Sequence, residues 1–235
     1  MSKLGVRLAA AAVLAGWFVH AHASLSLRPP QNFPAALGAE NTILTLQNIG
    51  SFSFEAGSVG RVVGSATDVI SGDVLTGPSQ TRTRSLGSLG IGSAADLRVV
   101  FKPLEPADVL NQGISLNNLQ LSIYSPTGSL LFNSGFFEPI DFADAMTGAG
   151  NSGFVFALDP VQAAQAQTFA FGSGFAANLV GLSAAASNAT GSFETFYVAS
   201  AVAIAPIPEP ESVALLLVGF AAMRLVLPRR ARERT

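Results

Sequence analysis

Hydrophobic and polar residues alternate over several short stretches of the chain, which are separated by glycine, proline and asparagine. The clearest stretch is 118–124, where Leu119, Leu121 and Ile123 alternate with polar residues. Successive side chains of a strand point to opposite faces, so this pattern predicts a strand with one buried and one solvated face. Residues 125–128 follow with proline second and glycine fourth, which predicts a tight turn and a hairpin with 129–133.

Other segments rich in β-branched, aliphatic and aromatic residues predict further strands. They are 42–47, 52–54, 59–67, 68–75, 97–101, 154–158, 179–185 and 193–200. The last two are expected to form the closing pair of the domain around a turn at 187–191. Residues 25–41, with three prolines, predict an extended entry segment at a sheet edge. The stretch 76–95 is dominated by Gly, Ser, Thr and Arg and predicts a long surface loop.

One helix is predicted in the middle of the chain. Asp159 has the chemistry of an N-cap, Pro160 suits the first helical position, and helix-forming residues follow to Gln167. About two turns are expected, placed as a lid over one end of a sandwich. Many short strands, 23 glycines and little helix predict an all-β fold, an antiparallel β-sandwich of jelly-roll type.

Composition limits the classes of function. The chain has 235 residues, of which 49% are hydrophobic and 12% charged, so it can form one domain with a sizeable core. The net charge is −2, but residues 24–207 contain six basic and twelve acidic residues. An acidic domain of this kind lacks the basic surface that nucleic acids require, so no nucleic-acid partner is expected.

The first 23 residues have the pattern of a secretory signal peptide. Lys3 and Arg7 precede an apolar run at 8–19, which is too short to span a membrane comfortably, although an uncleaved anchor is the alternative. The predicted cleavage site has the small residues Ala21 and Ala23, with Ser24 as the first mature residue. The exported domain would then be 24–205, preceded in the precursor by a signal helix.

Cleavage there would also decide which reactions are open to the mature protein. The chain has no cysteine, and its two histidines, His20 and His22, lie in the signal. A Ser-His-Asp triad, a cysteine nucleophile and nearly all zinc sites need residues that the mature chain would lack. We therefore expect no catalytic residue, no cofactor and no metal. A glycosidase needs only two carboxylates, so that mechanism stays open through the acids between Glu40 and Glu194.

The last 30 residues, 206–235, contain three parts in a fixed order. Pro208, Glu209 and Pro210 form an extended spacer, because proline disfavours both helix and central strand. The apolar run 213–227 follows as a predicted transmembrane helix of about 22 Å, shorter than a hydrocarbon core of about 30 Å. The basic residues are positioned to stop transfer and stay cytoplasmic. They are Arg224, Arg229, Arg230, Arg232 and Arg234.

This order of parts resembles the PEP-CTERM sorting signal of exported bacterial proteins. The resemblance covers about 30 residues, and it departs from the usual pattern in one place, since Arg224 lies before the end of the apolar run. It implies export through the Sec translocon, cleavage by signal peptidase and a halt in the inner membrane. It further implies recognition at Pro208 to Pro210 by an exosortase, a membrane cysteine transpeptidase that cleaves there. Families with such tails occur in Gram-negative bacteria that make exopolysaccharide and biofilm matrix.

The resulting hypothesis is a non-catalytic exported protein of the cell envelope or extracellular matrix, processed by an exosortase and associated with exopolysaccharide or biofilm. Segments 119–132 and 181–197 also resemble modules that accompany such tails, without naming a ligand. Two alternatives remain: an unprocessed, C-terminally anchored surface protein that binds carbohydrate, and a carboxylate-dependent glycosidase. For a carbohydrate binder, the supply of Trp and Tyr is small, because Trp17 lies in the signal and only Tyr124 and Tyr197 remain.

Three local features allow two interpretations each. Arg82 and Arg84 could bind an anionic polymer, although solvated loop residues are the favoured interpretation. The acidic residues Glu138, Asp141 and Asp144 could bind calcium through oxygen ligands, but they lack the spacing of an EF-hand, and solvated charges are favoured. Residues 188–190 match a glycosylation sequon, which the turn chemistry of asparagine and glycine already explains.

Overall fold

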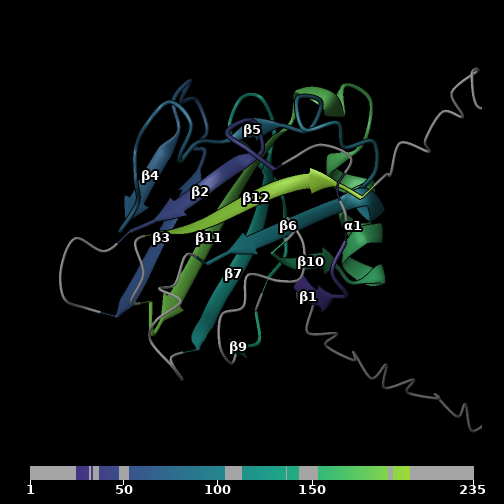
Figure 1. Ribbon diagram of the computed structural model, residues 1–235. Helices are drawn as coiled ribbons and strands as arrows, with labels where there is room; N and C mark the ends of the chain where they lie inside the picture. Colours follow the sequence, from purple (N-terminus) through teal and green to yellow (C-terminus); the bar gives the residue numbers. More distant parts are fainter. Residues whose placement is uncertain are drawn as a thin grey trace, which may run out of the picture.

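The computed structural model describes residues 25–31, 33, 37–47, 53–103, 113–135, 137–142, 153–189 and 193–201. These residues form two antiparallel sheets, one α-helix and two short 3-10 helices (Figure 1). The mostly-β class predicted from the sequence is confirmed for this part of the chain. The expected signal helix and the expected transmembrane helix at 213–227 lie outside the described residues.

The strands divide between a smaller and a larger sheet, and all of their pairings are antiparallel. In order across the five-stranded sheet they are β1 (Leu25–Arg28), β10 (Phe154–Leu158), β6 (Leu97–Lys102), β12 (Glu194–Ser200) and β2 (Thr42–Leu46). The seven-stranded sheet has the order β4 (Val69–Gly72), β3 (Phe54–Gly60), β11 (Leu179–Ser187), β7 (Ile114–Tyr124) and β8 (Leu130–Asn133). Its two remaining strands are β5 (Arg84–Ser85) beside β11 and β9 (Ile140–Phe142) beside β7.

Strand β7 shows how the sequence pattern becomes a two-faced sheet. Leu119, Leu121 and Ile123 are fully buried, as the alternation predicts. The strand begins earlier than predicted, and its pairing with β11 shifts register between Asn118 and Leu116. One extra residue at this bulge changes which face the preceding side chains of β7 take, so Ile114 and Leu116 also point into the core. The predicted turn at 125–128 is confirmed, and it leads into β8.

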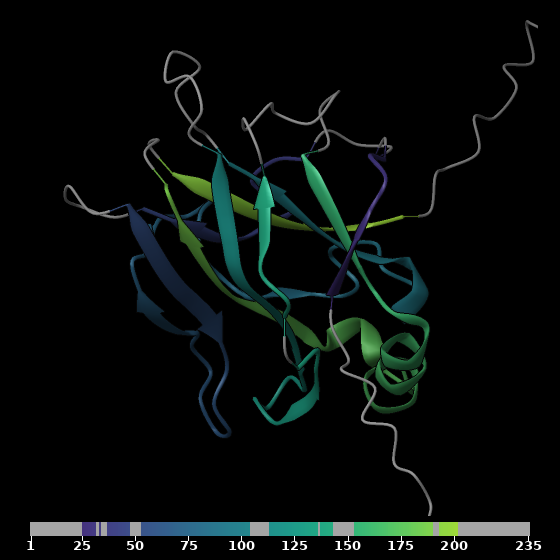
Figure 2. The same cartoon turned by 90° about the horizontal axis from the view of Figure 1, so that it is seen from below.

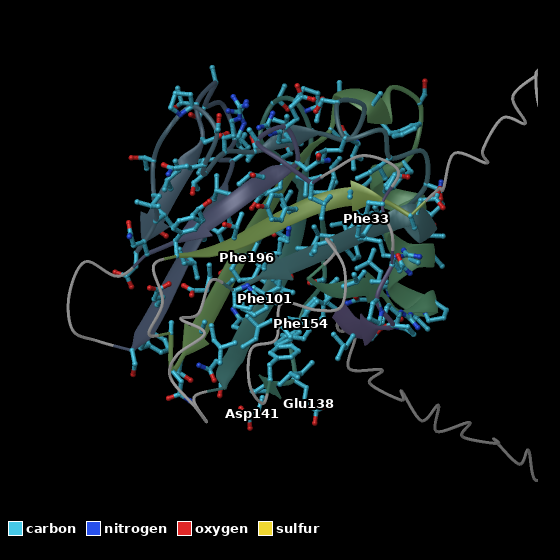
Figure 3. All side chains as sticks on the ribbon, in the orientation of Figure 1. Phe33, Phe101, Glu138, Asp141, Phe154 and Phe196 are labelled. Carbon is cyan, nitrogen blue, oxygen red and sulfur yellow. The ribbon has the colours of Figure 1, made fainter. Side chains whose placement is uncertain are left out.

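The two sheets pack face to face around one hydrophobic core that takes residues from both. Figure 1 shows β2, β12 and β6 crossing in front of β3, β11 and β7. Phenylalanine rings fill part of the space between the sheets (Figure 3): the rings of Phe101 and Phe196 stack with centroids 4.8 Å apart, and Phe154 lies beside Phe101 at 6.1 Å. The two sheets with a shared core agree with a sandwich arrangement.

Helix α1 (Pro160–Ala170) covers one end of the sheets, where it packs against β8, β10 and the 3-10 helix η1 (Ala94–Asp96), as Figure 2 shows. The side chain of Asp159 accepts hydrogen bonds from the backbone N–H groups of Val161 and Gln162 at 2.8 and 2.9 Å, so the predicted N-cap is confirmed. The helix runs to Ala170, about one turn further than predicted. The other 3-10 helix, η2 (Phe175–Ala177), follows it.

A buried glutamine fastens this helix to the larger sheet. Gln162 is 1% exposed, and its amide nitrogen donates to the backbone oxygen of Ser134. The Ser134 hydroxyl in turn accepts a hydrogen bond of 2.9 Å from the backbone N–H of Leu121 in β7. A polar residue in the first turn of the helix therefore marks the side that faces the protein here.

The predicted closing pair of strands is wrong. Strands β11 and β12 both form, but β11 lies between β3 and β7 in the larger sheet, whereas β12 lies between β6 and β2 in the smaller one. The connection between them therefore passes from one sheet to the other. Short separation along the chain predicted a hairpin, but each of these strands has two other partners that saturate both of its edges with hydrogen bonds.

Two loop predictions also change. In the stretch 76–95, the side chains of Leu86, Leu89 and Ile91 are buried in the core, and β5 interrupts the segment, so it is not simply a surface loop. The strand predicted over 59–67 ends at Gly60, and the following residues form a turn that is held by hydrogen bonds. Of the entry segment predicted over 25–41, residues 25–28 form the edge strand β1 as expected, whereas residues 39–41 form a turn before β2.

Candidate functional site

The outer face of the larger sheet carries a hollow of about 310 Å³, which we call the Tyr124 hollow. It lies over β3, β11 and β7, three strands that are far apart in the sequence. The side chains that line it alternate with buried residues of the same strands, so they point away from the core. Those used below are Ser58, Arg61, Gln120, Ser122, Tyr124 and Ser183.

The ring of Tyr124 lies across two glycines of the neighbouring strands. A Cβ atom placed on Gly60 of β3 would be 2.6 Å from the Tyr124 hydroxyl, and one placed on Gly181 of β11 would be 3.1 Å from ring atom Cε2. Both glycines therefore leave room that any other residue would fill. The ring rests against their backbone, which gives the hollow an aromatic surface lying along the sheet.

Polar side chains surround this ring, and part of their hydrogen-bonding capacity is already used. The hydroxyls of Ser58 and Ser71 lie 2.8 Å apart, the Ser122 hydroxyl accepts from Asn133 at 2.9 Å, and the Gln120 amide donates to Gly135 at 3.2 Å. Among the described residues, the hydroxyls of Tyr124 and Ser183 and the Gln120 side-chain oxygen have no hydrogen-bond partner. These three groups can bind the polar groups of a ligand.

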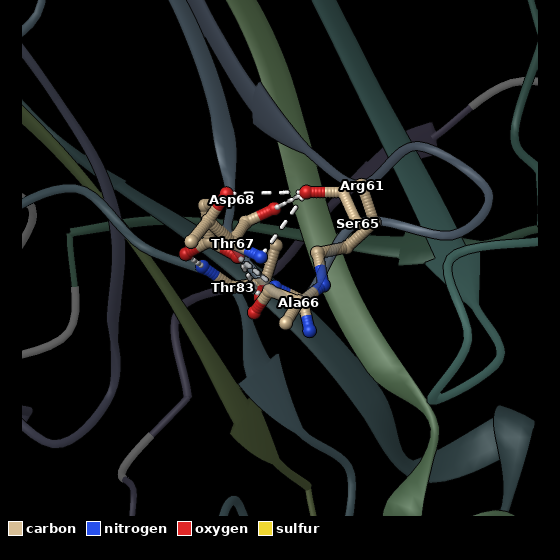
Figure 4. Close-up of polar contacts among 6 residues, drawn as sticks. All are labelled: Arg61, Ser65, Ala66, Thr67, Asp68 and Thr83. Carbon is tan, nitrogen blue, oxygen red and sulfur yellow. Dashed lines mark hydrogen bonds and ion pairs between the residues drawn. The ribbon is translucent and has the colours of Figure 1, made fainter.

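The charge beside the hollow is compensated within the protein (Figure 4). The Arg61 guanidinium donates to the backbone oxygen of Ala66 at 2.7 Å and lies 3.3 Å from the Asp68 carboxylate. Asp68 also accepts from the backbone N–H and the hydroxyl of Thr83, at 2.8 and 2.6 Å. This network holds residues 61–68 beside the sheet and leaves the hollow electrically almost neutral.

Arg82 and Arg84 are both only partly exposed, which differs from the favoured prediction of solvated loop residues. Arg84 is half-buried, and its guanidinium donates to the backbone oxygens of Thr42 and Ala39. Burial, and secondarily the charge of Arg82, lowers the pKa of Arg84, which stays cationic near neutral pH because its ordinary value is so high. This side chain fastens β5 to the segment that precedes β2 and is not placed to hold an anionic polymer.

The other local candidates are not assembled into a site. Glu138 and Asp141 are exposed (Figure 3), and Asp144 lies outside the described residues. Over the part of the chain that the structure describes, no three Asp, Glu, His or Cys residues are grouped to hold a metal. Asn188 is exposed with φ of +60°, which fits the turn chemistry predicted for it, while Thr190 of the sequon is not among the described residues.

Sequence reasoning missed two buried carboxylates, Glu55 and Glu194, which are 4% and 1% exposed. Glu55 lies at the start of β3, paired with the end of β11, and Glu194 starts β12, paired with Leu46 at the end of β2. Both therefore lie at the end of the sheets opposite α1. Their burial differs from the open cleft in which the two carboxylates of a glycosidase meet a polysaccharide. The signal available in the sequence was a charged residue at a strand position that lies among buried residues.

The predicted sorting and cleavage residues cannot be placed in the fold. The signal-peptide residues Ala21, Ala23 and Ser24 precede the first described residue, and the sorting residues Pro208, Glu209 and Pro210 follow the last. The arginines of the tail lie beyond 201 as well. Within the described residues, no helix has the length and apolar character that crossing a membrane requires.

Comparisons of the chain with protein-family models, curated proteins and solved structures find no match.

Proposed function

We propose that this chain is a non-catalytic exported protein of the cell envelope or extracellular matrix, which an exosortase sorts and processes at its C-terminus. The observation that carries the proposal is the order of parts in 206–235: Pro208-Glu209-Pro210, an apolar run and an arginine-rich end. A pre-extended, polar spacer next to a short apolar helix gives a membrane protease an accessible substrate just outside the bilayer. The partners are the Sec translocon, signal peptidase and the exosortase.

The arrangement of the described domain is compatible with this route. Leu25 at its start pairs with Leu158, next to α1, and Ala201 at its end donates to the backbone oxygen of Asp96 in η1, which packs on α1. Both ends of the domain therefore lie on the same side, beside α1. A chain that is held in the membrane through either terminal segment would present the rest of the two-sheet domain outward.

We further propose that the two sheets are a jelly roll. Eight strands pair in a nested way along the chain, with the first against the last and so on inward. These pairs are β2 with β12, β3 with β11, β6 with β10 and β7 with β8. Rolling up one long antiparallel hairpin of four strand pairs gives this order, and it gives two Greek keys.

Association with exopolysaccharide is the role we propose for the exported domain. The Tyr124 hollow supports it, because an aromatic surface beside hydroxyl and amide groups is suited to sugars, which have apolar ring faces and polar edges. The alternative is the same binding role in a protein that remains anchored by an uncleaved tail. A glycosidase activity has less support, since Glu55 and Glu194 are enclosed in the core.

Intact mass of the exported chain separates processing from simple anchoring. Expressed with an exosortase, the processed chain should end between Pro208 and Ser212, whereas an anchored chain keeps Thr235. Replacing Pro208, Glu209 and Pro210 together by alanine should abolish the shorter product. The matched control is Pro228→Ala, which removes a proline outside the motif and should leave processing unchanged. An identical mass with and without the exosortase would reject the sorting proposal.

Binding to the host's purified exopolysaccharide tests the proposed association with that polymer. The processed chain should migrate more slowly in a native gel that contains the polysaccharide, relative to a reference protein of similar charge. Equal mobility with and without the polymer would remove the association and leave the sorting proposal standing.

A further inference from the structure

We infer that the Tyr124 hollow is a binding site for an uncharged sugar unit of a polysaccharide, with the sugar ring stacked on the tyrosine ring. The inference rests on the proposed association with exopolysaccharide and adds the place of binding and the class of sugar. Four features of the hollow support it: its size, its aromatic surface, its free polar groups and its neutrality.

The hollow has the size of a small subsite. Its volume of about 310 Å³ is near the lower limit of the range of about 300–1,000 Å³ that small-molecule sites span. It is formed on a sheet by regular strands, with residues 61–69 beside it. A shallow site on a rigid sheet suits one unit of a long polymer, because neighbouring units can continue past it.

A tyrosine with a purely structural role would not need the orientation that Tyr124 has. The ring is turned along the sheet because Gly60 and Gly181 have no Cβ atoms beneath it. The ring therefore lies close to the backbone of β3 and β11, and it lines the hollow on the side of the sheet away from the core. A sugar ring stacks on such a surface through the apolar C–H groups of one of its faces.

Free polar groups lie around the ring where the hydroxyls of a stacked sugar would be. In the described part of the chain, the hydroxyls of Tyr124 and Ser183 can each donate and accept, and the Gln120 side-chain oxygen can accept. Ser122 and Gln120 are held by Asn133 and Gly135, so their positions are fixed before any ligand arrives. Fixed groups lose less conformational freedom on binding.

The charges select an uncharged sugar. Arg61 is the charged residue that lines the hollow, and it is already paired with Asp68 and bonded to Ala66. An acidic sugar would need an unpaired cation to replace the water lost by its carboxylate. The surrounding hydroxyl and amide groups instead match neutral hydroxyls.

The test measures binding of the secreted, processed chain and four variants to the host exopolysaccharide and to defined oligosaccharides. The uncharged probes are cellohexaose, maltohexaose and mannohexaose, and the anionic probe is hexaguluronate. Tyr124→Ala should weaken binding by about tenfold, and Tyr124→Phe, which keeps the ring, by about threefold. Gly60→Ala should weaken binding by several-fold, because its Cβ would displace the tyrosine ring and its hydroxyl while leaving the other polar groups of the hollow in place.

The control for the glycine variant is Gly92→Ala. A Cβ atom at Gly92 has no atom within 4 Å, and this exposed position lies away from the hollow, so binding should not change. Thermal unfolding of each variant shows whether it is folded. The clash at Gly60 involves only the end of the Tyr124 side chain, so that variant should fold.

The outcomes separate the site from the proposed function. Binding to the exopolysaccharide that is unchanged in Tyr124→Ala and Gly60→Ala would overturn the site and leave polysaccharide association intact. Binding to hexaguluronate but to none of the uncharged probes would overturn the sugar class. Lack of binding to the exopolysaccharide and to every probe would overturn both the site and the association, whereas processing at 208–212 would still support sorting.

Discussion

Gly128 is the position at which a single methyl group should disturb both the fold and the Tyr124 hollow. This glycine ends the turn between β7 and β8, with φ of +88°. A Cβ atom there would lie 2.2 Å from the backbone oxygen of Val62 and 3.1 Å from the backbone nitrogen of Val63. Val62 lines the hollow, so the turn supports the segment beside it.

The expected cost of Gly128→Ala has two parts. A left-handed conformation costs a non-glycine residue about 1–2 kcal/mol. The Cβ atom must also push the Val62 backbone away, which breaks the 3.0 Å hydrogen bond from Gly64 N–H to the Thr127 oxygen, worth about 0.5–1.5 kcal/mol. The sum is about 2–3 kcal/mol, and for a domain of this size it lowers Tm by on the order of 8 °C.

Two glycines elsewhere in the chain, Gly90 and Gly92, provide matched controls that separate the conformational cost from the steric cost. Gly90 has φ of +66° and nothing within 4 Å of its Cβ position, so Gly90→Ala measures the conformational cost alone. Gly92 also has open space but no positive φ, so Gly92→Ala should be neutral or slightly stabilising. Urea unfolding of the three variants gives the free energies, and retention on exopolysaccharide shows whether the hollow has changed.

The reasoning predicts an order of destabilisation, with Gly128→Ala greater than Gly90→Ala and Gly92→Ala last. If Gly128→Ala costs no more than Gly90→Ala, the turn does not support residues 61–68 as described. If it costs more but sugar binding is unchanged, the position of Val62 does not matter for the hollow.

Three further predictions concern the helix, the core and pH. Asp159→Ala should cost about 1 kcal/mol in urea unfolding through loss of the N-cap, and Asp159→Asn much less; equal losses would contradict this. Phe101→Ala should cost about 3–5 kcal/mol because its ring stacks on Phe196 in the core, so a cost under about 1 kcal/mol would contradict the packing. Burial raises the pKa of Tyr197, so the contribution of this residue to the stability of the fold is present below about pH 10 and is lost as the pH rises further. The Tm of Tyr197→Phe should therefore fall less between pH 9 and 11 than that of the parent chain, and an equal fall would refute the assignment.

The position of the Tyr124 hollow explains why it was not found from the sequence. Tyr124 ends a strand whose alternation was predicted, so its outward direction could be foreseen. Its partners Gly60 and Gly181 are 64 and 57 residues away, and they have the appearance of strand-breaking residues in a linear sequence. Only the pairing of β11 with both β3 and β7 brings the three together.

Local chemistry determined several parts of the structure. The alternation in β7, the proline and glycine of the following turn, and the aspartate and proline that begin α1 act through nearest neighbours along the chain. The sequence alone also carries the tail at 206–235, whose proposed recognition depends on a short linear motif. These features need no distant contact, so they can be recognised without a fold.

The tertiary structure decided the partners of each strand, which residues are buried and what the polar side chains bind. Any strand edge can form hydrogen bonds with any other, so the sequence could not tell that β11 and β12 belong to different sheets. Burial of Leu86 and the fastening of Arg84 to backbone oxygens depend on the opposite sheet lying over them. Strand existence is a local property, whereas pairing and burial depend on contacts between segments far apart in the chain, and the candidate sugar site is formed by such contacts.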